Sequence, residues 1–286
     1  MKLLSFLDRL AAAPAAITGN TPRRAVLHQV AYAAIATLPV ALGAALPAAA
    51  TPNDTSYDAL AQLLLLERLQ LEFYTRALNT LGLIPTAQVA DFQRLKLHQS
   101  QHAAFLLQAL QNAGATVPAV PAFDFSGQHG VATNPVLFPN VLSSYDDFLA
   151  LAQQLEDLGV RMYKSLISSI TYDAQLFRSV LRLHTVEARH SAHVRGLRRG
   201  RGVLVKNWPS ETDAVIVLPA AAQALTNAAT GGEQNTLQYL TAGTPVPFSS
   251  FLLIRDNTAI HDSSLPEAFD ELLTSADAQA ALNLFS

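Results

Sequence analysis

Six polar side chains of the kinds that bind transition metals recur at matching positions in four segments of the chain. Two segments each carry a glutamate, and the other two each carry a glutamine or glutamate followed three residues later by a histidine. The six residues are Glu67, Gln99, His102, Glu156, Glu187 and His190. Carboxylates combined with imidazoles suit Fe(II), Mn(II) or Zn(II) rather than soft metals. The pattern therefore predicts a site that holds one or two of these metal ions.

Glu67 interrupts an apolar helical stripe. Residues 63–78, LLLLERLQLEFYTRAL, repeat apolar side chains at the three- and four-residue spacing of a buried helix face. Burying an unpaired carboxylate costs several kcal/mol, so Glu67 needs a cation, a hydrogen-bond donor or a shifted pKa. The same anomaly recurs on the stripes of the three other segments, which makes a shared partner for these polar groups the central expectation.

Four long helices must carry these residues. We expect the first to begin at Asp54 or Ser56 and run to about Thr80, and the second to begin at Thr86 and end near Asn112. The third begins after Ser143 or Ser144 and reaches about Ile170, and the fourth follows a turn at Tyr172-Asp173 and reaches about Arg199.

The connections between these helices favour one topology. Short loops join the first helix to the second and the third to the fourth, and a proline- and glycine-containing stretch, 114–142, links the two pairs. This connectivity is typical of an all-α, ferritin-like antiparallel four-helix bundle with a long crossover. Residues three apart on a helix are neighbours, so the four motifs are expected to meet at one level of the core.

Gln99 departs from the usual pattern of such a site, in which two helices each supply Glu-x-x-His. A neutral amide at this position removes one negative charge, so a second ion would bind weakly or not at all, and more weakly than the ion held by the third and fourth helices. His98 lies about 100° round the helix from Gln99 and is a poor substitute. It is expected as a lateral residue or as a partner behind the ligands.

A metal-free interpretation stays open. Protonated His102 and His190 could pair with the three carboxylates in a buried network. Tyr74 and Tyr163, each seven residues after a glutamate of the cluster, are expected to pack and to donate hydrogen bonds. Polar residues expected to lie beside the site or on the surface, rather than bind metal, are Glu72, Asp157, His184 and His193. We expect three arginines, Arg195, Arg198 and Arg199, to lie in the last turn of the fourth helix. Their positive charges interact favourably there with the negative end of the helix dipole.

The N-terminal region carries an export-signal pattern. After a short amphipathic segment, 1–20, the pair Arg23-Arg24 precedes an uncharged apolar run, Val30–Ala50, with a small-residue end. Together these features resemble a twin-arginine export signal and predict a periplasmic or secreted protein. The run of about 21 residues is also long enough to anchor the chain in a membrane uncleaved. A buried helix of a cytoplasmic protein is the third interpretation.

The chain divides into three predicted parts: an N-terminal extension and linker, 1–53, the bundle, 54–202, and a C-terminal extension, 203–286. The extension lacks the periodic apolar faces of an independent core, so we expect it to wrap the bundle. Within it, residues 215–218 are expected to form a short strand or an extended segment, and a last helix is expected from Pro266 to about Asn283.

Composition excludes several classes of site. The 286 residues are 50% hydrophobic and 14% charged, with a net charge of −3. No basic block indicates nucleic-acid binding. The partners expected from the six-residue pattern are metal ions. The sequence has no cysteine, which excludes disulfides, thiolate metal sites and cysteine nucleophiles. Any metal must therefore be held by histidine, carboxylate or amide groups.

Four stretches resemble a known family. LERLQLEFYTRAL, HQSQHAAFL, QLEDLGVRMY and VEARHSAHVRGLR are similar to segments of the ferritin-like domain family that includes bacterial and plant desiccation-related proteins. The resemblance covers residues 54–199, and 203–286 more loosely. It implies an iron-binding protein, or one that oxidises Fe(II) with O₂ or peroxide, in stress protection. A non-enzymatic, desiccation-related structural protein is the alternative, and whether the chain is an enzyme stays open.

Overall fold

The computed structural model describes residues 54–170, 173–233, 239–241, 244–246, 266–268 and 270–286. These all belong to one compact unit, Ala50–Ser286. The predicted amphipathic segment, the arginine pair and the apolar run lie outside the described residues, as does Tyr172. Within the part of the chain that is described, no helix is both long enough and apolar enough to cross a membrane.

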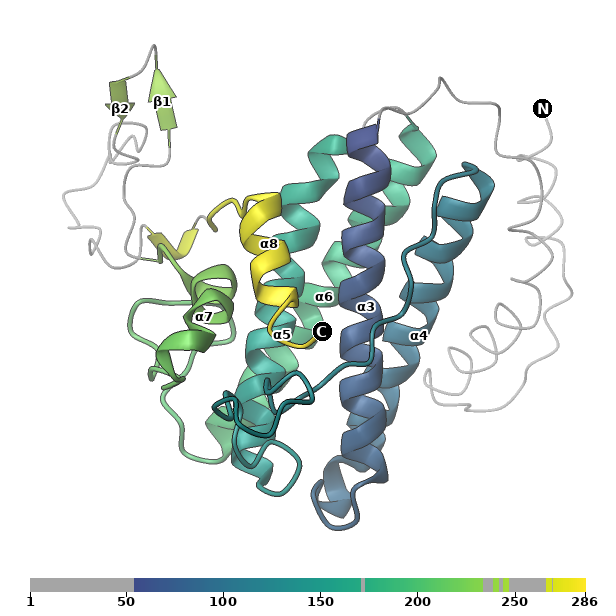
Figure 1. The fold of residues 1–286 in the computed structure, drawn as a ribbon. Coiled ribbons are helices and arrows are strands. Elements are labelled where there is room, and N and C mark those ends of the chain that lie inside the picture. The colour runs from purple at the N-terminus through teal and green to yellow at the C-terminus, as the bar shows by residue number, and fades with distance from the viewer. Residues whose placement is uncertain (1–53, 171–172, 234–238, 242–243, 247–265, 269) are drawn as a thin grey trace, which may run out of the picture. The chain divides into compact units, whose positions relative to one another are not determined.

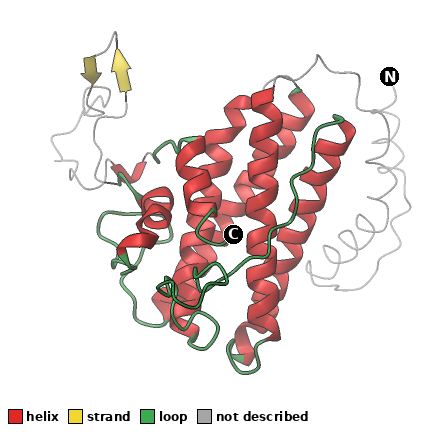
Figure 2. Ribbon diagram, in the orientation of Figure 1, coloured by secondary structure: helices red, strands yellow, loops and turns green. Residues whose placement is uncertain are grey.

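Four long helices form the body of the described unit (Figure 1). They are α3 (Asp54–Asn79), α4 (Val89–Asn112), α5 (Tyr145–Leu166) and α6 (Ala174–Gly200). Helix α3 pairs with α4 and α5 pairs with α6, while α3 also meets α5 and α4 meets α6. This arrangement confirms the predicted all-α four-helix bundle. Figure 2 shows that helices account for most of the described ribbon.

The predicted Ser144 cap of the third helix is confirmed, and Asp173 of the predicted turn caps the fourth helix. The hydroxyl of Ser144 accepts a hydrogen bond from the backbone N–H of Asp147, and the carboxylate of Asp173 accepts from the N–H groups of residues 175 and 176. Such side chains satisfy the free N–H groups of the first turn. Thr86 does not cap the second helix. It begins a 3₁₀ turn, η1 (Thr86–Gln88), which continues into α4 with no side-chain cap.

Helix α5 ends earlier than the predicted Ile170, because its last residues tighten into a 3₁₀ turn, η2 (Ile167–Ser169).

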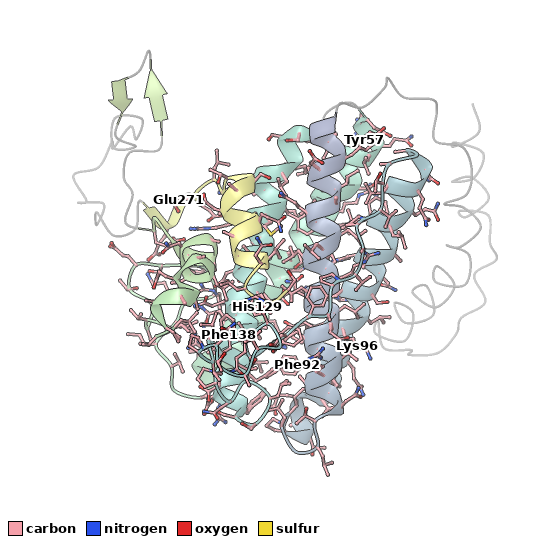
Figure 3. All side chains as sticks on the ribbon, in the orientation of Figure 1. Tyr57, Phe92, Lys96, His129, Phe138 and Glu271 are labelled. Atoms are coloured by element: carbon pink, nitrogen blue, oxygen red, sulfur yellow. The ribbon has the colours of Figure 1, made fainter. Side chains whose placement is uncertain are left out.

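The aromatic core lies toward one end of the bundle. Phe73, Tyr74, Phe92 and Phe148 are fully buried there, with ring centroids of neighbouring pairs 5.0–6.4 Å apart. Figure 3 shows Phe92 toward the lower end of the bundle in that view. Large aromatic rings contribute most of the apolar area that such a core buries.

The crossover, 113–144, is held to the bundle by aromatic side chains. Phe123, Phe125 and Phe138 are buried, and the ring of Phe138 stacks on that of Phe285 at 4.8 Å. The backbone N–H of Asp124 also donates to the carbonyl of Phe285 at 2.8 Å. The end of the chain is therefore fastened to the long loop that links the two helical hairpins.

The C-terminal extension contributes two short helices that cover α5. Helix α7 (Gln223–Thr230) follows a 3₁₀ turn, η3 (Ala220–Ala222), and packs on α5 and on α8 (Ser275–Leu282), which also touches α3. Residues 151–159 of α5 are consequently buried on every side. A helix that is covered all round belongs to the core rather than to the surface.

The C-terminal extension differs from the prediction at the start of its last helix. The predicted start of the last helix at Pro266 is wrong: η6 (Pro266–Ala268) is a 3₁₀ turn, and α8 starts separately at Ser275 behind a Thr274 cap. Its end at Leu282 agrees with the predicted end near Asn283. Residues 215–218 form neither a helix nor a strand. Strands β1 (Tyr239–Thr241) and β2 (Thr244–Val246) form a small antiparallel hairpin, with Tyr239 opposite Val246.

Candidate metal centre

All six predicted residues come together in the core. The six residues are between 0% and 6% exposed, and each of the four long helices contributes at least one. Glu67 comes from α3, and Glu156 from α5. Gln99 and His102 lie one turn apart on α4, as Glu187 and His190 do on α6. The predicted convergence of the four motifs is what the structure shows.

The carboxylates and imidazoles form two overlapping triads, each with ligand atoms within 4.8 Å of one another. In the first, Nδ1 of His102 lies 3.2 Å from Oε1 of Glu67 and 3.1 Å from Oε1 of Glu187. In the second, Nδ1 of His190 lies 3.5 Å from Oε2 of Glu156 and 3.3 Å from the same Oε1 of Glu187. Glu187 therefore belongs to both triads.

This sharing removes the reason for the expected asymmetry between two ions. Each triad contains one carboxylate of its own, one imidazole and Glu187. The hydroxyl of Tyr74 on α3 donates to Glu156, and that of Tyr163 on α5 donates to Glu67. The two hairpins thus exchange tyrosine-to-carboxylate hydrogen bonds, which holds the outer carboxylates in place and confirms the predicted role of both tyrosines.

The donor set fits a divalent transition metal. Oε2 of Glu67, Oε2 of Glu156, Oε1 of Glu187 and Nδ1 of His190 are buried, and none has a hydrogen bond of good geometry. Oε1 of Gln99 is in the same condition. Buried polar atoms are normally paired, and this group of orphaned atoms could hold a metal ion. The oxygen and imidazole chemistry matches Fe(II), Mn(II) or Zn(II).

Comparison with known proteins agrees with this geometry. Residues 55–199 match the family model described as the ferritin-like domain. The chain belongs to the ferritin-like domain family. No curated protein matches the chain. The matched residues contain all six predicted site residues and the four long helices except the first residue of α3 and the last of α6. The family match and the buried cluster therefore concern the same part of the molecule.

Burial and mutual charge set unusual pKa values in this ferritin-like bundle. Burial, then the charge of Glu187, raises the pKa of Glu67 and that of Glu156 to about 7. Burial by itself lowers the pKa of the imidazoles, but hydrogen bonds and charge from their carboxylate neighbours raise it to about 9 for His102 and about 10 for His190. Burial raises the pKa of Glu187, but both imidazoles together hold it well below its usual range.

These shifts predict that the metal-free ferritin-like protein loses stability as pH rises. Two carboxyls titrate near 7 in the folded state and at 4.5 when unperturbed, and two imidazoles titrate near 9 and 10 instead of 6.5. The folded state therefore binds more protons than the unfolded state throughout this range, and the free energy of unfolding falls with increasing pH. The contribution of Glu187 has the opposite sign but is lost only below about pH 4.5.

Calorimetry of the metal-free protein between about pH 6 and pH 9 measures this dependence. The melting temperature is expected to fall across the range. Because ligands must be deprotonated to bind a cation, added Mn(II) should raise the melting temperature more at pH 8.5 than at pH 6. A metal-free protein that melts higher at pH 8.5 would contradict the predicted sign.

Two residues adjoin the site without being among its predicted ligands. Nδ1 of His98 lies 2.9 Å from Nε2 of His190, behind the ring whose Nδ1 faces the carboxylates. Burial and the nearby charges of His190 and His102 lower the pKa of His98 to about 4, so it is neutral and can accept this contact. The expected place of His98 behind the ligands is correct. A partner of this kind fixes ring orientation.

Gln70 was missed by sequence reasoning. It is fully buried on α3 and contacts Gln99 and Glu187. Its position three residues after Glu67, on the same helix face, is the signal that could have found it. Glu72, by contrast, pairs with Arg76 at 40% side-chain exposure, and His193 approaches Asp91 at the surface, as expected of lateral residues.

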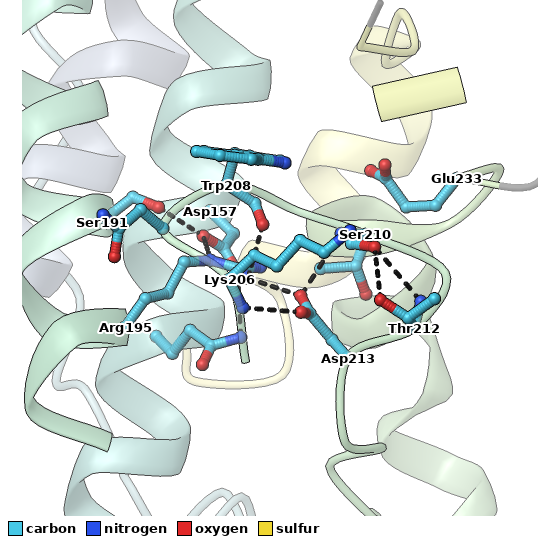
Figure 4. Close-up of polar contacts among 12 residues, drawn as sticks. Asp157, Ser191, Arg195, Lys206, Trp208, Ser210, Thr212, Asp213 and Glu233 are labelled. Carbon is cyan, nitrogen blue, oxygen red and sulfur yellow. Dashed lines mark hydrogen bonds and ion pairs between the residues drawn. The ribbon is translucent and has the colours of Figure 1, made fainter. Parts of the chain in front are cut away.

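The prediction for Arg195 is wrong. Its side chain is fully buried instead of serving the helix terminus, and it pairs with Asp157 at 2.6 Å and with Asp213 at 2.5 Å (Figure 4). Asp157 also accepts from Ser191 at 2.6 Å. Arg195 thus joins α6, α5 and the extension. A second acidic cluster consists of Glu233, Asp270 and Glu271. All three carboxylates form ion pairs with the guanidinium of Arg161, which balances part of their negative charge without a metal ion.

Proposed function

We propose that this ferritin-like bundle binds two divalent ions of iron or manganese, and that with iron it oxidises Fe(II) with O₂ or peroxide as a protection against stress. The single observation that carries the proposal is the pair of triads that share Glu187, with orphaned oxygens in a fully buried position. Iron held by these residues would supply the electrons that reduce O₂ or peroxide.

The protein's own residues have definite roles in this proposal. Glu67 with His102, and Glu156 with His190, hold the two positions, and Glu187 contributes to both. Tyr74 and Tyr163 donate hydrogen bonds that orient the outer carboxylates. His98 supports the ring of His190. The apolar and aromatic core around the triads restricts the access of water, which strengthens the attraction between carboxylates and a cation.

The Gln99→Glu variant tests the proposal. Nε2 of Gln99 lies 3.4 Å from Oε2 of Glu187, so a glutamate there adds a fourth carboxylate to a crowded, buried group. Like charges in this position destabilise the metal-free protein. We expect Gln99→Glu to melt lower than wild type without metal, and to gain more from Fe(II) or Mn(II). Thermal unfolding of both proteins, each with and without metal, measures the difference.

Metal content measured per chain in protein purified from its native compartment completes the test, with two ions expected. Melting that does not respond to metal in either protein would contradict the proposal. It would favour the second candidate function, a non-enzymatic desiccation or stress protein.

A specific observation favours this second function. Ion pairs of His102 and His190 reach all three carboxylates, and Tyr74 and Tyr163 donate hydrogen bonds to the two outer ones. The amide nitrogen of Gln99 also donates to the amide oxygen of Gln70 at 2.9 Å. Such a network can persist without an ion, so the metal titration distinguishes the two functions.

Export through the twin-arginine route is part of the proposal. It is supported by Arg23-Arg24, the uncharged run Val30–Ala50 and its alanine-rich end. Replacing both arginines with lysine should leave the precursor in the cytoplasm, and cell fractionation with immunodetection measures this. Replacement of Lys2 with arginine is the matched control and should not change export. Export and processing that continue in the double lysine variant would exclude this route.

A further inference from the structure

Gln70 is a fully buried amide whose hydrogen bonds are all inside the bundle. Its Nε2 donates to the backbone carbonyl of Leu155 at 3.0 Å and lies 3.5 Å from Oε2 of Glu187. Its Oε1 accepts from Nε2 of Gln99 at 2.9 Å. Gln70 therefore connects α3 to the backbone of α5 and to the side chain on α4 that occupies the place of an expected carboxylate.

These contacts fix which way both amides point. A backbone carbonyl can only accept a hydrogen bond, so the carbonyl of Leu155 requires the nitrogen of Gln70 to face it. The oxygen of Gln70 then faces Gln99 and requires the nitrogen of Gln99 in turn. The oxygen of Gln99 is left over, and it is buried with no hydrogen-bond partner. The opposite orientation would bring two acceptors together at Leu155.

Gly159 makes the room that this arrangement needs. A Cβ atom at this position would lie 3.2 Å from Nε2 of Gln70 and 2.9 Å from Oε2 of Glu187. Gly159 follows Glu156 by three residues, just as Gln70 follows Glu67 by three. Gln70 and Gly159 thus occupy equivalent positions in the two repeated hairpins. The first hairpin has the amide side chain there, and the second has a glycine that leaves space for that side chain.

We propose that Gln70 is a positioning residue that turns the amide of Gln99 so that its carbonyl oxygen becomes a neutral ligand of the metal centre. This inference rests on the proposed function. Gln99 then takes part in binding instead of being a lost ligand, and the site is built for three carboxylates and an amide. The main-chain carbonyl of Leu155 on α5 orients the amide of Gln70, and the amide of Gln70 in turn orients that of Gln99.

A double-mutant cycle with Gln70→Leu, Gln99→Leu and the double variant tests this role. Mn(II) binding to the metal-free proteins is measured by calorimetry, and the visible absorption of bound Co(II) reports a change of ligand. We expect Gln70→Leu to weaken binding roughly 10–100-fold, the range for loss of an outer hydrogen-bond partner. In the Gln99→Leu background it should weaken binding no further, because there is no amide left to orient.

The controls separate positioning from a general effect on the fold. Gln62→Leu makes the same substitution on α3 at a residue that contacts Ser275, and it should bind Mn(II) like wild type. Gln70→Met, an unbranched apolar replacement, serves if Gln70→Leu does not fold. Unchanged affinity in a folded Gln70 variant, or additive losses in the cycle, would overturn the inference alone. Wild-type protein that binds neither metal would overturn the proposed function together with it.

Discussion

Glu187→Gln is expected to abolish metal binding at both positions, whereas Glu67→Gln and Glu156→Gln should each abolish it at one. Glu187 is the one carboxylate common to the two triads, and its Oε1 lies 3.1 Å from Nδ1 of His102 and 3.3 Å from Nδ1 of His190. The loss should exceed the roughly 10–100-fold that follows removal of an outer hydrogen-bond partner. Each outer carboxylate, by contrast, belongs to a single triad.

Calorimetric titration of the metal-free variants with Mn(II) measures this difference as stoichiometry. We expect two ions per chain for wild type, one for each outer variant and none for Glu187→Gln. Glu72→Gln is the matched control, because Glu72 lies on α3 with Glu67 but is 40% exposed and paired with Arg76. Glu187→Gln that still binds one ion or two would show that the triads do not share this residue as a ligand.

Of the substitutions considered, Arg195→Met is expected to lower the free energy of unfolding most. The guanidinium is fully buried and pairs with Asp157, itself 1% exposed, and with Asp213. Removing one partner of a buried ion pair costs about 3–5 kcal/mol, because the remaining charge has no compensation. For a domain of this size each kcal/mol corresponds to about 2–4 °C, so the melting temperature should fall by roughly 6–20 °C.

Differential scanning calorimetry of the metal-free protein measures the loss. The double variant Asp157→Leu/Arg195→Met should recover much of it, since replacing both members of a buried pair with apolar residues is often close to neutral. Arg201→Met is the control: Arg201 pairs with Asp146 at the surface and should contribute little. Equal melting temperatures for Arg195→Met and Arg201→Met would contradict the assigned role of the buried pair.

Arg195 also explains how the extension depends on the bundle. Asp213 receives the guanidinium of Arg195 and hydrogen bonds from the backbone N–H groups of Lys206 and Ser210 (Figure 4). One buried cation therefore fixes the loop that leaves α6. Asp157 follows Glu156 and Ser191 follows His190, so this network adjoins the candidate metal centre through both helices.

The sequence by itself determined the four long helices and the six residues of the candidate site. Apolar spacing fixes which face of each helix is buried, and a charged residue on such a face, as at Glu67, needs a partner inside the core. Glu187 and His190 lie three residues apart, so a single helix is enough to bring them together. These features depend on local geometry, which is why they could be read from the chain.

Only the tertiary structure decided which groups meet across helices. That Glu187 serves both triads, that Tyr74 reaches Glu156, and that Gln70 orients Gln99 all depend on the register between helices far apart in sequence. The burial of Arg195 likewise requires Asp157 from α5 and Asp213 from the extension. Helical periodicity specifies the face that a side chain occupies, but the height at which neighbouring helices pack specifies its partner.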